Sequence, residues 1–271
     1  ITPGVPGPEE LEAVVRIAQE RDVSIHLKLD SGMGRMGVVE AELPRVAELL
    51  RSAPRLRVEA IYSHFANAGD VGDPFTSDQL ARFKALLATL REARITAPLH
   101  HMGNSAATMR GIVEPGHYVR AGLALYGAAT LDDGSGRLEP LLRWRTEIAR
   151  IKELPAGHAI GYGTTFRTPR PSRIATLPVG YADGYNRRLS NRGEVLLRGR
   201  RAPIVGRVSM DLVTIDVTDI DGAAVGDEVI LLGRQGNEEV AVEELAAKLD
   251  TISYEVFCSL GARVPRVYLD V

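Results

Sequence analysis

The sequence predicts an α/β domain followed by a mainly antiparallel β domain, and three observations lead to this prediction. Residues 1–128 alternate between short apolar runs and longer runs with apolar residues at helical spacing, a pattern typical of a parallel sheet with crossover helices. Residues 138–271 hold short strand-like runs separated by Gly, Asp and Asn, as in antiparallel domains. A turn-rich linker at 131–136 separates the two patterns, so we expect domains at 1–130 and 131–271.

The first domain is expected to begin with a helix that no strand precedes. Pro8 suits a first helical position, and Leu11, Val14, Val15 and Ala18 follow at helical spacing. Further along, we expect strands at 23–29, 58–62, 99–102 and 118–125, and helices at 40–52, at 77–94 with a Ser77 cap, and from Asn104.

In the second domain the expected strands are short, and one helix interrupts them. Cys258 ends an apolar run that reads as a strand, so we expect a buried thiol there. The expected strands are 143–152, 173–179, 194–197, 202–208, 213–217 and 228–232, with a helix at 241–249 before the closing strands.

Composition excludes several functional classes. The 271 residues are 45% hydrophobic and 25% charged, as in a soluble globular protein. A net charge of −2 gives no broad attraction to nucleic acids or membranes. A single cysteine excludes an internal disulfide and a multi-cysteine metal site. We find no signal peptide and no long apolar segment, which favours a cytoplasmic protein.

Arg120 is the most informative residue. It ends an apolar run and a glycine, Gly122, follows almost at once, as where a barrel strand delivers a side chain into a site and bares N–H groups to a phosphate. Four other runs, 26–37, 63–66, 101–108 and 161–166, accompany it. In order and content the five runs closely resemble the alanine racemase family of pyridoxal phosphate (PLP) enzymes, which have a barrel and a β domain.

The resemblance extends from Val5 to Tyr268 and predicts the second half of a (β/α)₈ barrel followed by the β domain. Four strands are expected where a closed barrel needs eight. The family's amino-terminal Lys-Ala-Asn-Ala-Tyr-Gly-type run, whose lysine forms the Schiff base with PLP, is not found in the sequence. We therefore expect the chain to be truncated and that lysine to lie outside it.

Three residues are expected to control proton transfer in the reaction, either as a base or by setting the protonation of another group. The resemblance places Arg120 against the pyridine nitrogen of PLP; a guanidinium cannot give up its proton, so that nitrogen stays unprotonated and transamination is suppressed. Tyr162 matches the second base, which acts in the partner's site of a homodimer. An ordinary phenol ionises only near pH 10, and a chain Tyr162–His64–Arg120 would place positive charge beside it.

Other residues are expected to hold the phosphate and the substrate carboxylate. Ser105, Gly122 and Leu123 resemble the phosphate cup, to which Tyr254 adds a hydroxyl. Arg35 matches the arginine that contacts the carboxylate, and a carbamylated Lys28 would hold Arg35. The resemblance further implies that Met210 and Asp211 serve the partner's substrate site, and that Tyr181, Arg187 and Arg207 line the access corridor.

A few residues have simpler interpretations. Asp30 is expected to orient the loop after Lys28. For Tyr185 and Arg188 we prefer a solvated surface loop. His100 and His101 could suggest a metal pair, but neighbouring residues on a strand point to opposite faces, so no metal is expected.

The resemblance implies racemisation of L- and D-alanine by two-base proton transfer, supplying D-alanine for cell-wall peptidoglycan. A racemase for serine or for a broad range of amino acids is the alternative with the same cofactor. A PLP-type decarboxylase fits less well, because the Gly-Tyr-Gly and Ser-Met-Asp runs are racemase-like. A non-catalytic fragment that lacks the lysine is the alternative from another class.

Overall fold

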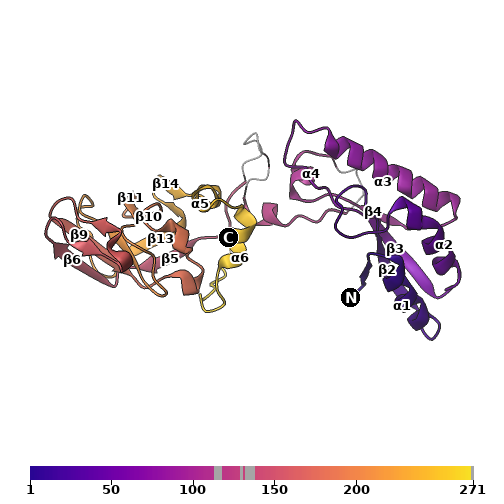
Figure 1. The fold of residues 1–271 in the computed structure, drawn as a ribbon, viewed down its shortest axis with the longest axis horizontal. Helices are drawn as coiled ribbons and strands as arrows, with labels where there is room; N and C mark the ends of the chain where they lie inside the picture. The colour runs from indigo at the N-terminus through magenta and orange to yellow at the C-terminus, as the bar shows by residue number, and fades with distance from the viewer. Residues whose placement is uncertain (113–117, 129–130, 132–137, 270–271) are drawn as a thin grey trace. The chain divides into compact units, whose positions relative to one another are not determined.

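The computed structural model describes residues 1–112, 118–128, 131 and 138–269, and it divides into two compact units (Figure 1). The first, which we call the α/β unit, comprises Ile1–Leu125 and Ala129–Arg137; the second, the β unit, comprises Tyr126–Ala128 and Leu138–Val271. Apart from Leu131, the expected linker at 131–136 lies outside the described residues. No helix in the described ranges is long and apolar enough to cross a membrane.

The α/β unit is built on a four-stranded parallel sheet with the order β1-β2-β3-β4. Helix α1 starts with a proline at its first turn and has Glu9 and Glu10 there and Arg16 in its last turn, charges that complement the helix dipole. The elements are β1 (Gly4–Val5), α1 (Pro8–Ala18), β2 (Val23–Lys28), η1 (Glu40–Glu42), α2 (Leu43–Arg51), β3 (Leu56–Tyr62), α3 (Phe75–Glu92), β4 (Leu99–His101), α4 (Ser105–Met109) and the 3-10 turn η2 (Leu123–Tyr126).

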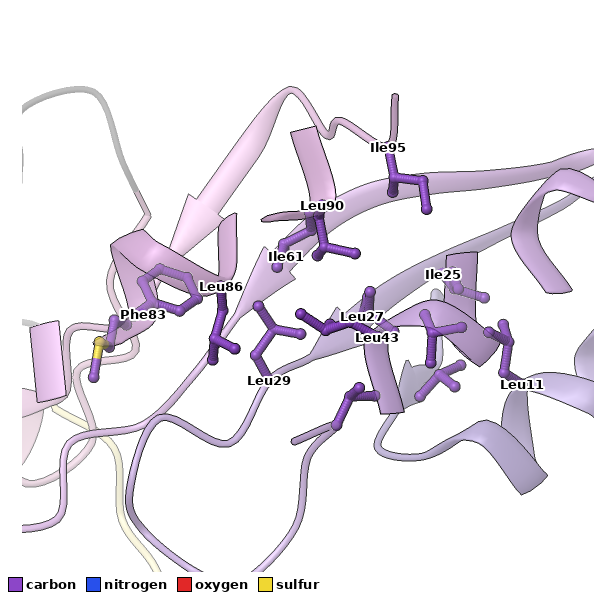
Figure 2. Close-up of a cluster of buried hydrophobic side chains, with 14 of the residues drawn as sticks. Leu11, Ile25, Leu27, Leu29, Leu43, Ile61, Phe83, Leu86, Leu90 and Ile95 are labelled. Carbon is purple, nitrogen blue, oxygen red and sulfur yellow. The ribbon is translucent and has the colours of Figure 1, made fainter. Parts of the chain in front are cut away.

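One face of this sheet carries the hydrophobic core. Leu27 of β2 lies beside Ile61 of β3, and both are fully buried against side chains of the helices α1, α2 and α3 (Figure 2). Because successive strand residues point to opposite faces, the neighbours Lys28 and Tyr62 lie on the other face. Packing of the helices on one face therefore leaves polar side chains together on the face opposite.

Three expectations for this unit are wrong. A strand, β1, does precede the first helix; it has two residues, too few to give a periodic pattern. The expected strand at 118–125 is, in the residues described, a single bridge from Asn104 to Arg120 followed by η2. Helix α3 begins at Phe75, whose N–H is accepted by the Asp73 carboxylate at 2.9 Å, so Ser77 lies inside the helix and is not its cap.

In the β unit, every strand pairing is antiparallel. One sheet has the order β11-β10-β13-β14 with β5 on β13, a second has β12-β9-β6, and β7 pairs with β8. The elements are β5 (Trp144–Glu147), β6 (Arg150–Leu154), β7 (Ala159–Ile160), η3 (Tyr162–Thr164), β8 (Phe166–Arg167), β9 (Ser172–Leu177), η4 (Tyr181–Asp183), η5 (Arg187–Leu189), β10 (Glu194–Leu197), β11 (Arg200–Pro203), β12 (Val213–Asp216), β13 (Glu228–Gln235), β14 (Glu238–Val240), α5 (Val242–Leu249) and α6 (Ser253–Ser259).

The order of an α/β region and then an antiparallel β region is thus confirmed, with local differences. The strand expected at 143–152 is divided, because the Ile148 N–H donates to Asp227, which directly precedes β13 of one sheet, and the Ala149 N–H donates to Thr176 in β9 of the other. Helix α6 stands where closing strands were expected. Its buried residues, Ser253 and Val256, are three apart, which is a helical spacing. Cys258 on α6 is exposed, so the expectation of a buried thiol is wrong.

Candidate active site

A row of polar side chains crosses the face of the α/β sheet opposite the core. Strand register places Lys28 beside Tyr62, and Tyr62 beside His101. The Tyr62 and His101 rings are stacked with centroids 4.9 Å apart. The Lys28 Nζ lies 5.8 Å from the centre of the Tyr62 ring, within the range of a cation–π attraction. His100 is the neighbour of Ile61 instead, so the two adjacent histidines do face opposite ways.

Arg120 extends this row from the loop beyond β4. Its backbone N–H donates to the Gly103 carbonyl at 2.8 Å, next to the bridge with Asn104. The guanidinium Nη2 donates to the Ser63 carbonyl at 2.7 Å and to His64 Nδ1 at 2.9 Å. Its Nη1 donates to His101 Nδ1 and, at 3.3 Å, to the His101 carbonyl. The sheet thus holds Arg120 through the ends of two strands.

These contacts determine the protonation of both histidines. A guanidinium only donates hydrogen bonds, so the Nδ1 atoms of His64 and His101 must accept, and each neutral ring carries its proton on Nε2. Burial, followed by the charge of Arg120, lowers the pKa of both imidazoles from 6.5 to about 4. Burial also lowers the pKa of Arg120, yet a guanidinium stays charged in proteins. The site therefore holds a cation between two neutral rings at neutral pH.

One donor of Arg120 remains. A guanidinium has five N–H groups, and the contacts above engage the four on Nη1 and Nη2. Across the described part of the chain the Nε–H has no hydrogen-bond partner. This N–H can donate a hydrogen bond to a ligand atom, and because a guanidinium does not release its proton, that atom would stay unprotonated.

Ser105 forms a second polar centre nearby in the chain. It is buried, and its Oγ accepts the backbone N–H groups of Gly122 at 2.9 Å and Ala124 at 3.2 Å. Because a hydroxyl accepts two hydrogen bonds and donates one, the Ser105 O–H is left to donate. A Cβ built on Gly122 would meet no atom within 4 Å. The hydroxyl thus lies against the backbone N–H of an exposed glycine with open space around its Cα, as suits an anion site.

The loop after Lys28 holds a third set of charges. The Asp30 carboxylate accepts the N–H groups of Gly32, Met33 and Gly34 at 2.8–3.2 Å, so it orients the loop as expected. Burial, and then the positive charges of Arg35 and Arg120, lower the pKa of Lys28. Burial and the two arginines thus make a charged ammonium less favourable at that position than in water, although Asp30 acts in the opposite direction.

Two residues of this network were missed by the sequence interpretation. His101 was considered only as a metal ligand, and Tyr62 was not considered. A signal was available in the sequence. Residues 28, 62 and 101 are each the last residue of a neighbouring parallel strand, so alternation along the strands predicts that their side chains lie on the same face at the same edge of the sheet. No group of three or more possible metal ligands occurs among the residues that the structure describes.

The β unit presents the other expected residues on its surface. Tyr162 on η3 is 73% exposed, and Tyr181, Met210 and Tyr254 are each about half exposed. Arg187 is exposed on η5. Tyr185 is the opposite case: it is fully buried in edge contact with Trp144, so the expectation of a solvated surface residue is wrong. Arg188, although exposed, donates to the Leu249 carbonyl at 2.8 Å.

Close backbone approaches hold two of these exposed tyrosines. Gly161 precedes Tyr162 with φ of +70°, and a Cβ there would lie 3.1 Å from the Arg207 nitrogen. Gly180 precedes Tyr181, and a Cβ there would lie 2.3 Å from the Met210 carbonyl oxygen. Glycine is therefore required at both positions. The fold of the unit places Tyr162 next to Arg207 and Tyr181 next to Met210.

Comparison with known proteins matches both units. A family model described as "Alanine racemase, N-terminal domain" matches residues 1–130, and "Alanine racemase, C-terminal domain" matches residues 141–268. The expectation that the amino-terminal part of the first domain is absent and that the cofactor lysine lies outside the chain finds no support here, because the N-terminal model matches from residue 1.

Curated relatives of this sequence are also named alanine racemase. An alanine racemase from Symbiobacterium thermophilum is 47% identical over 248 residues, which are 90% of this chain and 65% of the relative. One from Halothermothrix orenii is 43% identical over 99% of this chain and 72% of the relative. The chain thus spans about two thirds of the length of these relatives.

Solved structures similar to this chain are also alanine racemases. The alanine racemase from Bacillus anthracis with bound L-Ala-P has a TM-score of 0.89 at 36% identity, covering 98% of this chain and 70% of that one. The enzyme from Bartonella henselae with covalently bound pyridoxal phosphate has a TM-score of 0.88 at 31% identity, covering 99% and 73%.

Proposed function

The chain belongs to the alanine racemase family, and we therefore propose that the protein interconverts L-alanine and D-alanine with PLP as cofactor, by two-base proton transfer. Such an activity supplies D-alanine for peptidoglycan. The single observation that carries the proposal is the Arg120 guanidinium, a partly buried cation held as a donor between two neutral histidines. We also propose that the parallel sheet of the α/β unit is part of a (β/α)₈ barrel.

The residues present fit PLP. The Nε–H of Arg120, which has no partner among the described residues, would donate to the pyridine nitrogen without transferring a proton. The Ser105 hydroxyl, with the backbone at Gly122 and Leu123, would hold the phosphate, and Tyr254 would add a second hydroxyl to it. When bound, the cofactor withdraws electrons from the substrate Cα and so makes its proton acidic. Because Arg120 only donates, the protein limits this withdrawal and favours return of the proton to Cα.

Arg35 would bind the substrate carboxylate. It is exposed at the loop that Asp30 orients, and its charge is felt at both Lys28 and His64. We propose that Lys28 is carbamylated and holds Arg35 by an ion pair, because an ammonium there is disfavoured by burial and by two arginines. Met210 and Asp211, exposed on the β unit, would complete the substrate site of the partner.

Tyr162 of the partner subunit would act as the second base. Two-base racemisation needs proton-exchanging groups on opposite faces of the substrate carbon, and an exposed phenol on a glycine-flanked turn is suited to enter a neighbouring site. His64, held by Arg120, would orient that phenol. The access corridor would be lined by Tyr181, Arg187 and Arg207.

The test is the steady-state conversion of L-alanine to D-alanine by the full-length protein saturated with PLP, followed by circular dichroism. We expect activity on L-alanine, with kcat/KM for L-serine at least about tenfold lower, since a pocket can discriminate a small side-chain difference by about 10- to 200-fold. Equal rates would replace this proposal with a broad-spectrum racemase. No conversion would leave a non-catalytic PLP-binding protein.

The homodimer is tested by complementation. Tyr162→Phe and Arg120→Met are each expected to be inactive alone. If Tyr162 acts in the partner's site, a mixed dimer has one site with both defects and one with none, so equal mixing restores about a quarter of the wild-type activity. No recovery, in dimers shown to exchange subunits, would place Tyr162 in the site of its own chain.

The cofactor lysine is identified by borohydride reduction of the full-length protein and peptide mapping. We expect the label away from Lys28, because its neighbours are the cations Arg35 and Arg120 and its assigned role is to hold Arg35. A label on Lys28 would overturn that role.

A further inference from the structure

We infer that Arg263 is a positioning residue that clamps three surface segments of the β unit, and through them sets the substrate-side loop that contains Met210 and Asp211. The clamp itself is inferred from contacts within the β unit alone. Its effect on catalysis rests on the proposed function. The segments are 180–185, 209–211 and 259–263.

The guanidinium of Arg263 binds two carboxylates from different segments. Its Nε donates to Asp183 at 2.7 Å, and one Nη donates to Asp211 at 2.5 Å. Among the described residues, Arg263 is the only hydrogen-bond partner of the Asp211 side chain. Asp211 is more than half exposed, so without Arg263 its carboxylate would have no hydrogen-bond partner among the described residues.

Asp183 anchors the clamp. Its side chain is only 15% exposed, and its second oxygen accepts the Gly180 N–H at 2.8 Å. The backbone of the same turn pairs with the substrate-side loop, since the Tyr181 N–H donates to Ser209 and the Ala182 N–H to Met210, both at 3.0 Å. Asp183 therefore joins Arg263 to the turn that carries Tyr181.

The third segment is the end of helix α6. The Gly261 N–H donates to the Asp183 carbonyl at 2.9 Å, and a Cβ on Gly184 would lie 2.0 Å from the Ser259 carbonyl oxygen. Arg266 closes the turn that bears Arg263 by donating to the carbonyls of Leu260, Gly261 and Val264. Since Tyr254 lies on α6, the clamp links the proposed phosphate ligand to the proposed substrate loop.

An arginine that binds two carboxylates at once can fix their relative positions, whereas a lysine cannot. The guanidinium has a rigid planar fork, whereas an ammonium is a single mobile charge. Exposed ion pairs stabilise a fold little, so the effect of Arg263 should be on the precision of the loop and not on unfolding. Substrate contacts that loosen by even a fraction of an ångström bind less well.

The test compares Arg263→Ala, Arg263→Lys and the control Arg170→Ala in the full-length protein. Arg170 pairs with Asp219, also by an exposed ion pair of the β unit, and neither residue is a candidate site residue. For Arg263→Ala we expect KM for L-alanine to rise about tenfold with kcat changed less than about threefold, Arg263→Lys to lie between, and Arg170→Ala to match wild type.

Hydrogen–deuterium exchange of peptides covering 207–213 provides the readout that is independent of catalysis. Faster exchange there in Arg263→Ala, but not in Arg170→Ala, supports the clamp even if the wild-type protein racemises nothing, an outcome that would overturn only the proposed function. Unchanged exchange overturns the clamp whatever the activity.

Discussion

The two units hold their candidate site residues in opposite ways. In the α/β unit, Arg120, His64 and His101 lie on the sheet face opposite the core and are largely removed from water, with each Nη donor matched to an acceptor. In the β unit, the candidate residues are exposed on loops and short turns. Their positions come from tight backbone approaches and from the ion pairs of Arg263.

The contrast separates two tasks. A partly buried hydrogen-bonded network tunes protonation, because burial lowers the pKa values of both histidines and leaves the arginine as a fixed donor. Exposed side chains on restrained turns are suited to meet a second surface, here the proposed partner subunit. Changes to Arg120 and its two histidines should therefore alter protonation at the proposed cofactor, and changes to the exposed residues should alter what the β unit supplies to the partner's site.

The largest effect is expected from Arg120→Met. The change removes the donor to His64 and His101 and the proposed contact to PLP, so kcat should fall by at least about a hundredfold, as when a preorganised donor is lost. Steady-state racemisation measures it, with Arg120→Lys as the matched variant. Lysine keeps the charge without the fork and should recover only part of the rate; full recovery would show that charge alone suffices.

The second effect tests how the loop of Arg35 is shaped. Gly37 has φ of +129°, and a Cβ there would lie 2.6 Å from the Asp30 nitrogen, so Gly37→Ala should lower the free energy of unfolding by about 2–4 kcal/mol. Gly34, in the same loop with φ of +69°, is surrounded by open space, since a Cβ there would meet no atom within 4 Å. Gly34→Ala should cost about 1 kcal/mol. Urea denaturation distinguishes them, and equal costs would contradict the close approach.

The third effect is a dependence of stability on pH. The pKa of His64 and of His101 is about 4 in the folded protein against 6.5. Between these values the unfolded chain binds protons that the folded protein does not, so the histidines' contribution to stability falls as pH is lowered from 6.5 to 4. His64→Asn and His101→Asn, which keep an acceptor for Arg120, should each reduce this slope in urea denaturation. An unchanged slope would show that neither histidine is held neutral.

The smallest effect belongs to the β unit. The Tyr185 hydroxyl is buried and, among the described residues, has no hydrogen-bond partner, so Tyr185→Phe should raise the free energy of unfolding by about 1 kcal/mol. Tyr181→Phe, on the exposed turn nearby, should change stability by less than about 0.5 kcal/mol. A loss of stability in Tyr185→Phe would mean that the hydroxyl has a partner, such as a buried water.

Sequence reasoning succeeded where a pattern was long and local. The periodicity of residues 8–18 predicted helix α1, and that of residues 40–52 predicted a helix where the structure has η1 and α2. The change of pattern after residue 130 predicted the change from parallel to antiparallel strands. It failed for the two-residue strand β1, which has no periodicity, and for residues 118–125, where a glycine and a 3-10 turn replace a strand. It also took α6 for a strand, because its apolar and aromatic residues suit either structure.

The order of the elements and the residue types of the candidate site follow from the amino-acid sequence alone, since propensity and motif spacing are local properties of the chain. Which of these residues meet depends on the tertiary structure. Strand register brings Lys28, Tyr62 and His101 side by side, and the loop beyond β4 brings Arg120 to two histidines that precede it by 19 and 56 residues. Arg263 likewise reaches carboxylates 80 and 52 residues away. Such contacts depend on packing between distant segments, which no local pattern encodes.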